Sequence, residues 1–360
     1  MFQTKEPLSA TPGRRRWASR LGALALGLMT LAGASDAGFA MDKVRVGVIN
    51  AISDGTFYIA YEKGFFKDEG LDVEFIPFKA SAQMVAPLGA GQLDVAAGAV
   101  AAGLYNSAAR GIDMKIVADK GSMPAGYGYM PLLVRKDLVD NGTYKSFADL
   151  KKMKLGSQSI GGSAASTLNE ALVKGGLKFS DMDVVYLGHA ELALALQNKA
   201  LGAAFVTEPH ASRAVLEGSA VRVAGGDEVY PDDQLAVVLY SGDFAKNKRD
   251  VATRFMRAYI RGARFYNDAL RDGHFAGKTA GEVIPILAKY TEVQDPGLFK
   301  VMTPNGVDPN GKVNVASLKK DFEFFKTLDL IKGQVNLDSV IDMSFSDAAV
   351  STLGPYKPAL

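Results

Sequence analysis

The sequence predicts an α/β protein with two lobes, and three observations carry this prediction. From Asp42 onward, short segments of alternating apolar and polar residues are followed by segments with helical spacing. Strands that alternate with helices of about ten residues build parallel sheets from strand–helix–strand units. The same series restarts near Ser146, which indicates a second unit. The 360 residues of the chain are enough for two domains.

The first unit begins with a strand in which Val44, Val46 and Val48 alternate with other residues. Further strands are expected at 73–75, 95–97 and 114–117, and helices at 56–63, 82–90 and 101–110.

The second unit opens with Ser146, a helix N-cap residue followed three residues later by Asp149. Its strands are expected at 154–157, 184–187 and 203–206, and its helices at 163–174, 191–198 and 210–217. Apolar strands at 131–134 and 235–240 flank this unit, and we expect them to cross between the lobes. The first lobe would comprise 41–132 plus 236–360, and the second 133–235. A long amphipathic helix at 249–270 opens a helical tail that we expect on the first lobe.

The first 40 residues are typical of an export signal. Arginines at 14–16 and 20 precede an apolar run at 21–33, and small residues follow. This run is too short to span about 30 Å of hydrocarbon. The arginines at 14–16 resemble a twin-arginine export motif, although Gly13 and Ser19 depart from its flanks, so both the general secretory and the twin-arginine route stay open.

Composition excludes several classes of protein. There is no cysteine, so disulfides, thiolate zinc sites and thiol nucleophiles are impossible. Residues 1–40 carry five Lys/Arg and two Asp/Glu, which leaves 36 basic and 37 acidic residues in the rest of the chain. This balance gives no indication of nucleic-acid or anionic-membrane binding.

Four short motifs carry a family resemblance. They are Ala-Tyr-Glu-Lys-Gly-Phe-Phe at 60–66, Glu-Gly-Leu-Asp-Val at 69–73, Gly-Gln-Leu-Asp-Val-Ala at 91–96 and a strand ending in Thr-Glu-Pro at 207–209. In this order and spacing they resemble the nitrate/sulfonate/taurine group of periplasmic binding proteins, over about 43–265. Ala203 departs from the group, which usually has aspartate there.

The resemblance implies a type II periplasmic binding protein fold, in which two lobes enclose a ligand cleft. It further implies a periplasmic protein that passes a sulfonate, carboxylate or pyrimidine-like solute to the permease and ATPase of an ABC importer. We expect a monomer that uses no cofactor.

Ligands of open α/β sheets bind at the carboxyl ends of strands, where helix N-termini present free N–H groups. Four loops and one further strand end satisfy this condition. The candidate ligand-binding residues are Asn50, Ser53, Asp54, Thr56, Phe57, Gly98, Ala99, Ser157, Gly161, Gly162, Ser163, His189, Thr207 and Glu208.

Several candidates also have a purely structural interpretation. Asp54, Thr56 and Ser163 could cap helices, and Gly98 could serve tight strand–helix packing. Glu208 could make a structural hydrogen bond at the hinge. His189 could be a solvated loop residue. Because these loops contain no arginine, they favour a small organic acid or a polar heterocycle over a phosphate-like dianion.

Enzyme motifs are incomplete in this sequence. The segment 161–165 lacks the last glycine of the hydrolase nucleophile elbow, and 273–279 is one residue short of a phosphate-binding loop. The three histidines show no metal-ligand spacing, so we expect neither a metal site nor an enzyme. Two alternatives remain: an exported receptor domain that signals to a membrane partner, and a lyase or dehydratase of the same fold that uses a carboxylate.

Overall fold

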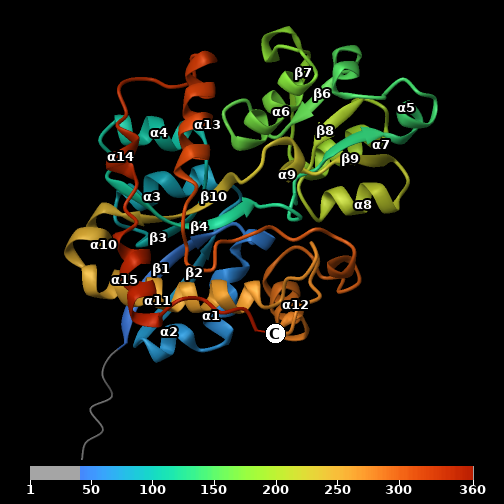
Figure 1. Cartoon of the computed structure of the whole chain (residues 1–360). Coiled ribbons are helices and arrows are strands. Elements are labelled where there is room, and N and C mark those ends of the chain that lie inside the picture. Colours follow the sequence, from blue (N-terminus) through green and yellow to red (C-terminus); the bar gives the residue numbers. More distant parts are fainter. Residues whose placement is uncertain (1–40, 360) are drawn as a thin grey trace, which may run out of the picture. The chain divides into compact units, whose positions relative to one another are not determined.

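A computed structural model describes residues 41–359 of the chain. The expected export signal at 1–40 lies outside the described residues. The described chain contains two five-stranded sheets (Figure 1). The first sheet has the order β2-β1-β3-β10-β4 and comprises β1 (Asp42–Val48), β2 (Leu71–Pro77), β3 (Val95–Ala99), β4 (Met114–Met123) and β10 (Asp233–Ser241). We call this sheet with its helices the first lobe.

The second sheet repeats the strand order of the first. Its order is β7-β6-β8-β5-β9, and it comprises β5 (Leu132–Arg135), β6 (Leu155–Ser157), β7 (Val184–Tyr186), β8 (Ala203–Phe205) and β9 (Ala220–Ala224). In each sheet three parallel strands are followed by one antiparallel strand, which is β10 in the first sheet and β5 in the second. We call this sheet with its helices the second lobe. The predicted two-lobed α/β architecture is therefore confirmed.

The two apolar strands expected to cross between the lobes are instead members of the sheets. Strand β5 pairs with β8 and β9, and β10 pairs with β3 and β4. The chain passes between the sheets at 124–131 and returns at 225–232. We therefore propose that the lobe boundaries lie in these two segments, a few residues before the positions expected from the sequence.

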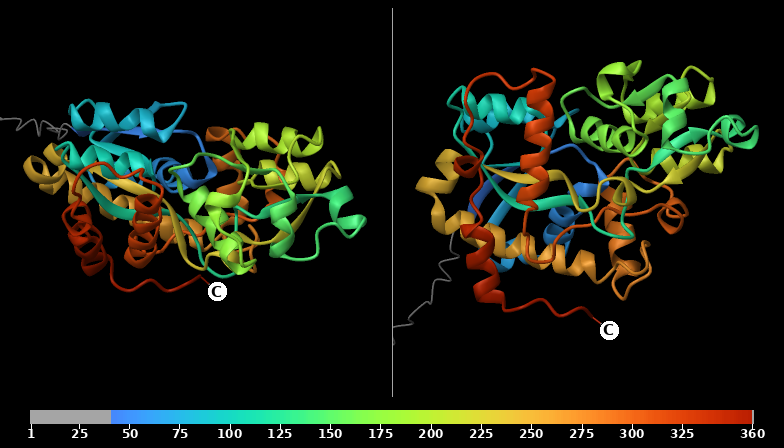
Figure 2. Two further views of the ribbon diagram at one scale, coloured as in Figure 1. Left: turned by 90° about the horizontal axis from the view of Figure 1, so that it is seen from above. Right: turned by 45° about the horizontal axis from the view of Figure 1, so that its top comes forward.

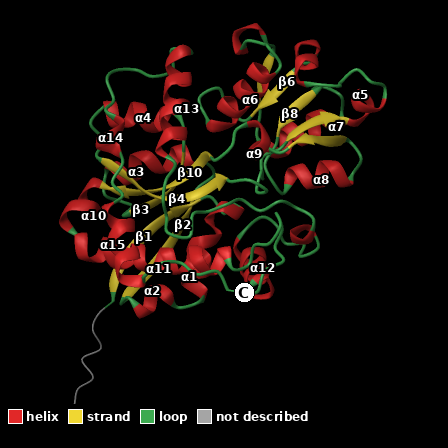
Figure 3. Cartoon of the chain, viewed as in Figure 1, coloured by secondary structure: helices red, strands yellow, loops and turns green. Residues whose placement is uncertain are grey.

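Fifteen α-helices surround the sheets in the described part of the chain (Figure 3). They are α1 (Gly55–Glu62), α2 (Phe65–Asp68), α3 (Val85–Gly89), α4 (Ala102–Ala109), α5 (Lys136–Asp140), α6 (Ser163–Lys174), α7 (His189–Gln197), α8 (His210–Leu216), α9 (Gly226–Val229), α10 (Gly242–Asn247), α11 (Arg249–Asn267), α12 (Ala280–Tyr290), α13 (Val315–Thr327), α14 (Leu337–Val340) and α15 (Ser344–Leu353). The single helix expected at 82–90 is a 3-10 turn, η2 (Ser81–Met84), followed by the short α3. Figure 2 shows the helices from two further directions.

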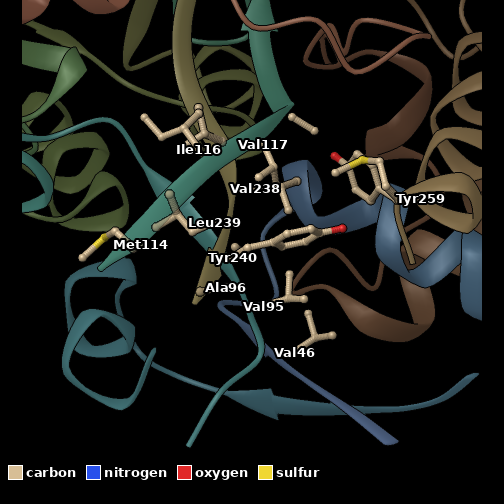
Figure 4. Packing of buried hydrophobic residues seen from close by; sticks show 14 of the residues in the cluster. Val46, Val95, Ala96, Met114, Ile116, Val117, Val238, Leu239, Tyr240 and Tyr259 are labelled. Atoms are coloured by element: carbon tan, nitrogen blue, oxygen red, sulfur yellow. The ribbon is translucent and has the colours of Figure 1, made fainter. Parts of the chain in front are cut away.

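The core of the first lobe lies around β10 and α11. Val46, Val95 and Tyr240 are fully buried beside Tyr259 of α11 (Figure 4). Helix α11 approaches α1 closely at Gly262, where an added Cβ would lie 2.6 Å from a backbone carbonyl oxygen of α1. A larger residue at this position would push the two helices apart.

Between residues 41 and 359, no helix has both the length and the apolar character needed to cross a membrane.

Candidate functional site

A cavity of about 400 Å³ lies between the two lobes, at the carboxyl ends of their parallel strands. The first lobe contributes the segments after β1 and β3, and the second lobe contributes the start of α6 and the segment after β8. This position agrees with the general rule for ligand sites in open α/β sheets. Eight predicted site residues line the cavity, namely Ser53, Gly98, Ala99, Gly162, Ser163, His189, Thr207 and Glu208.

The lobes contact each other directly at one side of this cavity. The backbone N–H of Ser163 donates to the carbonyl oxygen of Val100 at 3.3 Å, and the N–H of Ala102 donates to the carbonyl oxygen of Gly161 at 2.8 Å. The Ser163 bond uses the first N–H group of α6, and the Ala102 bond uses the first N–H group of α4. In this arrangement both N–H groups are satisfied by the protein.

The segment after β1 places Asp54 behind the cavity wall. Its side chain is fully buried and does not line the cavity, unlike Ser53. Oδ2 of Asp54 accepts from the backbone N–H groups of Ile49 at 2.9 Å and Ala51 at 3.3 Å. Oδ1 accepts from Nζ of Lys120 at 2.5 Å. The expectation that Asp54 faces the ligand is therefore corrected, because this carboxylate is engaged by protein groups.

Three other predicted residues of this segment also lie outside the cavity. Phe57 is fully buried, and its ring centroid lies 4.9 Å from that of Tyr259, so it belongs to the core and does not reach the cavity. Thr56 also belongs to α1, and it is buried at the point where α11 crosses this helix. Oδ1 of Asn50 accepts from the hydroxyl of Tyr58 at 2.8 Å.

In the second lobe, Ser157 and Gly161 do not line the cavity. Ser157 ends β6 and is fully buried, with no hydrogen-bond partner for its hydroxyl within the described structure. The carbonyl oxygen of Gly161 accepts the N–H of Ala102, so this residue forms part of the contact between lobes. Gly162 and Ser163, which follow directly, do reach the cavity.

His189 lines the cavity as a neutral ring. Its Nδ1 accepts from the backbone N–H of Thr207 at 3.3 Å. Burial, together with the neighbouring His210, lowers the pKa of His189 to about 4. At pH 7 the ring therefore presents no positive charge. His189 is partly buried and begins α7.

Glu208 also borders the cavity, but protein groups satisfy its carboxylate. Oε2 accepts from the N–H of Ser212 at 2.9 Å, and Oε1 accepts from the hydroxyl of Ser212 at 2.9 Å and from the N–H of Thr303 at 3.4 Å. Arg222 lies 4.0 Å away. Burial raises the pKa of Glu208, while these hydrogen bonds and the charge of Arg222 oppose that rise.

Several cavity residues were not foreseen from the sequence. They include Lys120, Tyr129, Met130, Gln158, Ser159, Thr303 and Asn305. Gln158 and Ser159 lie inside a loop already selected, so a broader choice within that loop would have included them. Lys120 is the most important cavity residue missing from the sequence-based candidates, because its ammonium group is the only fully buried cation in the described core. Within residues 41–359, no group of three or more His, Asp or Glu side chains could hold a metal ion.

A sequence model described as the NMT1-like family matches residues 39–276. The chain belongs to the NMT1-like family. A protein of Escherichia coli (strain K12), named as an aliphatic sulfonates-binding protein, is 27% identical over 237 residues. That match covers 63% of this chain and 68% of the relative.

Solved structures with the same fold include both binding proteins and an enzyme. The periplasmic aliphatic sulphonate binding protein SsuA from Escherichia coli superimposes with a TM-score of 0.68 at 20% identity, covering 85% of this chain and 99% of SsuA. The periplasmic nitrate-binding protein NrtA from Synechocystis PCC 6803 gives a TM-score of 0.69 at 15% identity, covering 87% of this chain and 89% of NrtA. The desulfurization enzyme DSZB gives a TM-score of 0.59 at 15% identity, covering 87% of this chain and 100% of DSZB. These likenesses show a type II periplasmic binding protein fold.

Proposed function

We propose that this chain is a periplasmic solute-binding protein that captures a small organic solute and delivers it to the permease and ATPase of an ABC importer. The observation that carries this proposal is the cavity of about 400 Å³ that is lined by residues of both lobes at their strand ends. A cavity of this size suits a small molecule. Membership of the NMT1-like family and the likeness to a sulfonates-binding relative support the same function.

Within this function, we assign the ligand contacts to the cavity residues of both lobes. Ser53, Gly98 and Ala99 would act from the first lobe. Gly162 and Ser163 would act from the second lobe, beside the group formed by His189, Thr207 and Glu208. A ligand that contacts both sets is bound more tightly by the closed arrangement than by an open one, and it therefore shifts the lobes toward closure.

One specific observation favours a second candidate function, because the desulfurization enzyme DSZB shares the fold. The chain contains no cysteine, so chemistry that depends on a thiol nucleophile is excluded. The enzymatic alternative considered from the sequence uses a carboxylate. Glu208 is the carboxylate at the cavity, and its oxygens already accept hydrogen bonds from protein groups.

A ligand screen tests the binding function. Thermal unfolding of residues 41–360 is measured with sulfonates, aliphatic and aromatic carboxylates, nitrate and aminopyrimidines. A ligand at 100 times its dissociation constant stabilises the protein by about 2.7 kcal/mol. Each positive compound is then incubated with the protein and analysed for new products. Binding without turnover supports the proposal, whereas turnover supports the enzyme and a complete lack of binding contradicts both.

Export and delivery need a separate experiment. Full-length tagged protein is expected in the periplasmic fraction, shortened by about 40 residues. Since Trp17 is the only tryptophan, the shortened protein would show tyrosine emission alone. Deletion of the gene is expected to abolish uptake of the radiolabelled ligand. Unprocessed protein in the cytoplasm, or unchanged uptake, would contradict this part of the proposal.

A further inference from the structure

Lys120 is an unusual residue for the wall of a cavity. Its side chain is only 1% exposed, yet it lines the space between the lobes. Lysine is almost never fully buried unless it is paired. Strand β4 carries Lys120 toward the cleft, and the ammonium group meets residues that follow β1.

The hydrogen bonds of Lys120 leave one donor unused. An ammonium group has three N–H donors and no acceptor. One bond goes to Oδ1 of Asp54 at 2.5 Å and a second to Oγ of Ser53 at 3.0 Å. Among residues 41–359 there is no third acceptor for this group. The remaining donor belongs to a side chain that lines the cavity.

Ser53 adds a second unused donor at the same place. Its Oγ accepts the bond from Lys120, and its hydroxyl hydrogen has no acceptor within the described part of the chain. Ser53 also lines the cavity. Two adjacent groups therefore offer hydrogens, and this corner of the site suits an acceptor-only group such as an oxyanion.

Asp54 fixes the position and the charge of this corner. Two backbone N–H groups hold its carboxylate, which lies outside the cavity and contacts Lys120. The Lys120–Asp54 pair is neutral overall. His189 is neutral as well, since the pKa of this ring is lowered to about 4. The Lys120–Asp54 pair therefore brings no surplus positive charge. The other charged residues that line the cavity are Lys79 and Glu208, whose opposite charges balance, so the site does not match a dianion.

We propose that Lys120 and Ser53 bind the acidic group of the ligand, that Asp54 positions Lys120, and that the preferred ligand carries a single negative charge. Carboxylates and sulfonates share this chemistry. This assignment rests on the proposed binding function. It makes Lys120 a recognition residue and Asp54 a positioning residue.

The test uses matched probes and a charge-neutral variant. The probes are hexanoate, benzoate and butane-1-sulfonate, their amides hexanamide, benzamide and butane-1-sulfonamide, and the dianion sulfate. A single Lys120→Met change would leave a buried carboxylate without its cation and risks unfolding the chain. The double variant Lys120→Met/Asp54→Asn removes both charges with little change of shape. The control Lys136→Met/Asp140→Asn makes the same replacement at an exposed ion pair of α5.

Calorimetry measures each dissociation constant. We expect the parent and the control to bind at least one monoanion about ten-fold or more tightly than its amide and than sulfate. The Lys120→Met/Asp54→Asn variant is expected to bind that acid and its amide equally. Ser53→Ala is expected to weaken binding of the acid by about two- to ten-fold.

Two results would overturn the inference and leave the binding function intact. One is a parent protein that prefers a neutral, cationic or doubly charged compound. The other is a double variant that keeps the preference for the acid. If the parent binds none of these probes and nothing in the wider screen, both the inference and the proposed function fail.

Discussion

Ser163 at the start of α6 donates its backbone N–H to the carbonyl oxygen of Val100, and this bond joins the second lobe to the first. A neighbouring bond runs the other way, from the N–H of Ala102 to the carbonyl oxygen of Gly161 at 2.8 Å. Opening of the cleft on this side has to break both bonds. The two loops therefore form a contact that favours the closed arrangement even before a ligand contributes.

Ala102→Pro is expected to open the cleft. Proline removes the N–H donor and places its ring near the carbonyl oxygen of Gly161. Ala102 is the first residue of α4 and follows an extended residue, a position that tolerates proline within the helix. We expect a larger radius of gyration in small-angle scattering and a ligand affinity about two- to ten-fold weaker. Ala102→Ser keeps the N–H and serves as the control. Equal radii and affinities for the two variants would contradict the role of this contact.

Asp54→Asn is expected to destabilise the protein. The substitution removes the negative charge from a fully buried ion pair and leaves Lys120 without a counter-ion. Loss of one partner of such a pair costs about 3 kcal/mol or more in the free energy of unfolding. Urea denaturation measures this change. Asp140→Asn, at an exposed ion pair, should change the free energy by less than about 0.5 kcal/mol. Equal stability of the two variants would show that the Lys120–Asp54 pair is not formed.

The sequence predicted the architecture because the relevant signals are local. Alternation at Val44, Val46 and Val48 identifies a strand without knowledge of its neighbours. The loops of the site could be selected for a similar reason, since they follow strands and open helices. In these loops, Ser53, Gly98 and six further predicted residues reach the cavity.

The features of the site and of the lobes that could not be predicted from the sequence depend on contacts between segments far apart in the chain. Lys120 looks like an ordinary polar residue in a strand, because its partner Asp54 lies 66 positions earlier. Phe57 looks like a cleft residue because α1 opens there, but α11 covers that side of the helix and buries Tyr259 against it. The two apolar strands were interpreted as crossing segments because an apolar strand such as β10 gives no sign in the sequence that it inserts antiparallel between β3 and β4.

A buried pair of carboxylates predicts how stability depends on pH. Asp233 accepts from hydroxyls of Thr167 and Ser317, and Asp321 accepts from the hydroxyl of Tyr230. Burial raises the pKa of Asp233 to about 7, and burial together with the charge of Asp233 raises the pKa of Asp321 well above its ordinary value. Other ionisable groups near the pair are Tyr105, Tyr129, Glu170 and Lys320.

Between about pH 4 and pH 7 the folded state therefore holds protons that the unfolded state has lost. The free energy of unfolding should fall as pH rises through this window. Asp321→Asn removes one of the two acids, so it should be more stable than the parent at pH 7.5, with a smaller difference at pH 4.5. Urea denaturation at both pH values measures the difference in the free energy of unfolding between the variant and the parent. An equal difference at the two pH values would show that the pair does not titrate in the window.

A second hollow predicts how ligand length affects affinity. It measures about 240 Å³, is lined by Leu104 and Leu239, and shares five lining residues with the cleft cavity, namely Ser81, Ala82, Gly98, Ala99 and Ala101. Gly103 also lines the hollow, and an added Cβ there would meet no atom within 4 Å. Leucine at this position can therefore fill space without a clash, and it favours α4 by about 0.5–1 kcal/mol relative to glycine.

Gly103→Leu should limit the length of the ligand that the protein accepts. A straight-chain series is used that carries the head group bound best by the parent. Each methylene that enters an apolar hollow contributes about 0.8 kcal/mol, or about four-fold in affinity, so affinity in the parent should rise with chain length until the hollow is full. In the leucine variant this rise should stop at a shorter chain, while the shortest member binds equally to both proteins. Calorimetry along the series measures how affinity depends on chain length in the parent and in the variant. Urea denaturation verifies that the variant is folded and at least as stable as the parent. Identical dependence on length would place the ligand chain elsewhere in the cleft, and weaker binding of every member would mean that leucine disturbs the head-group site.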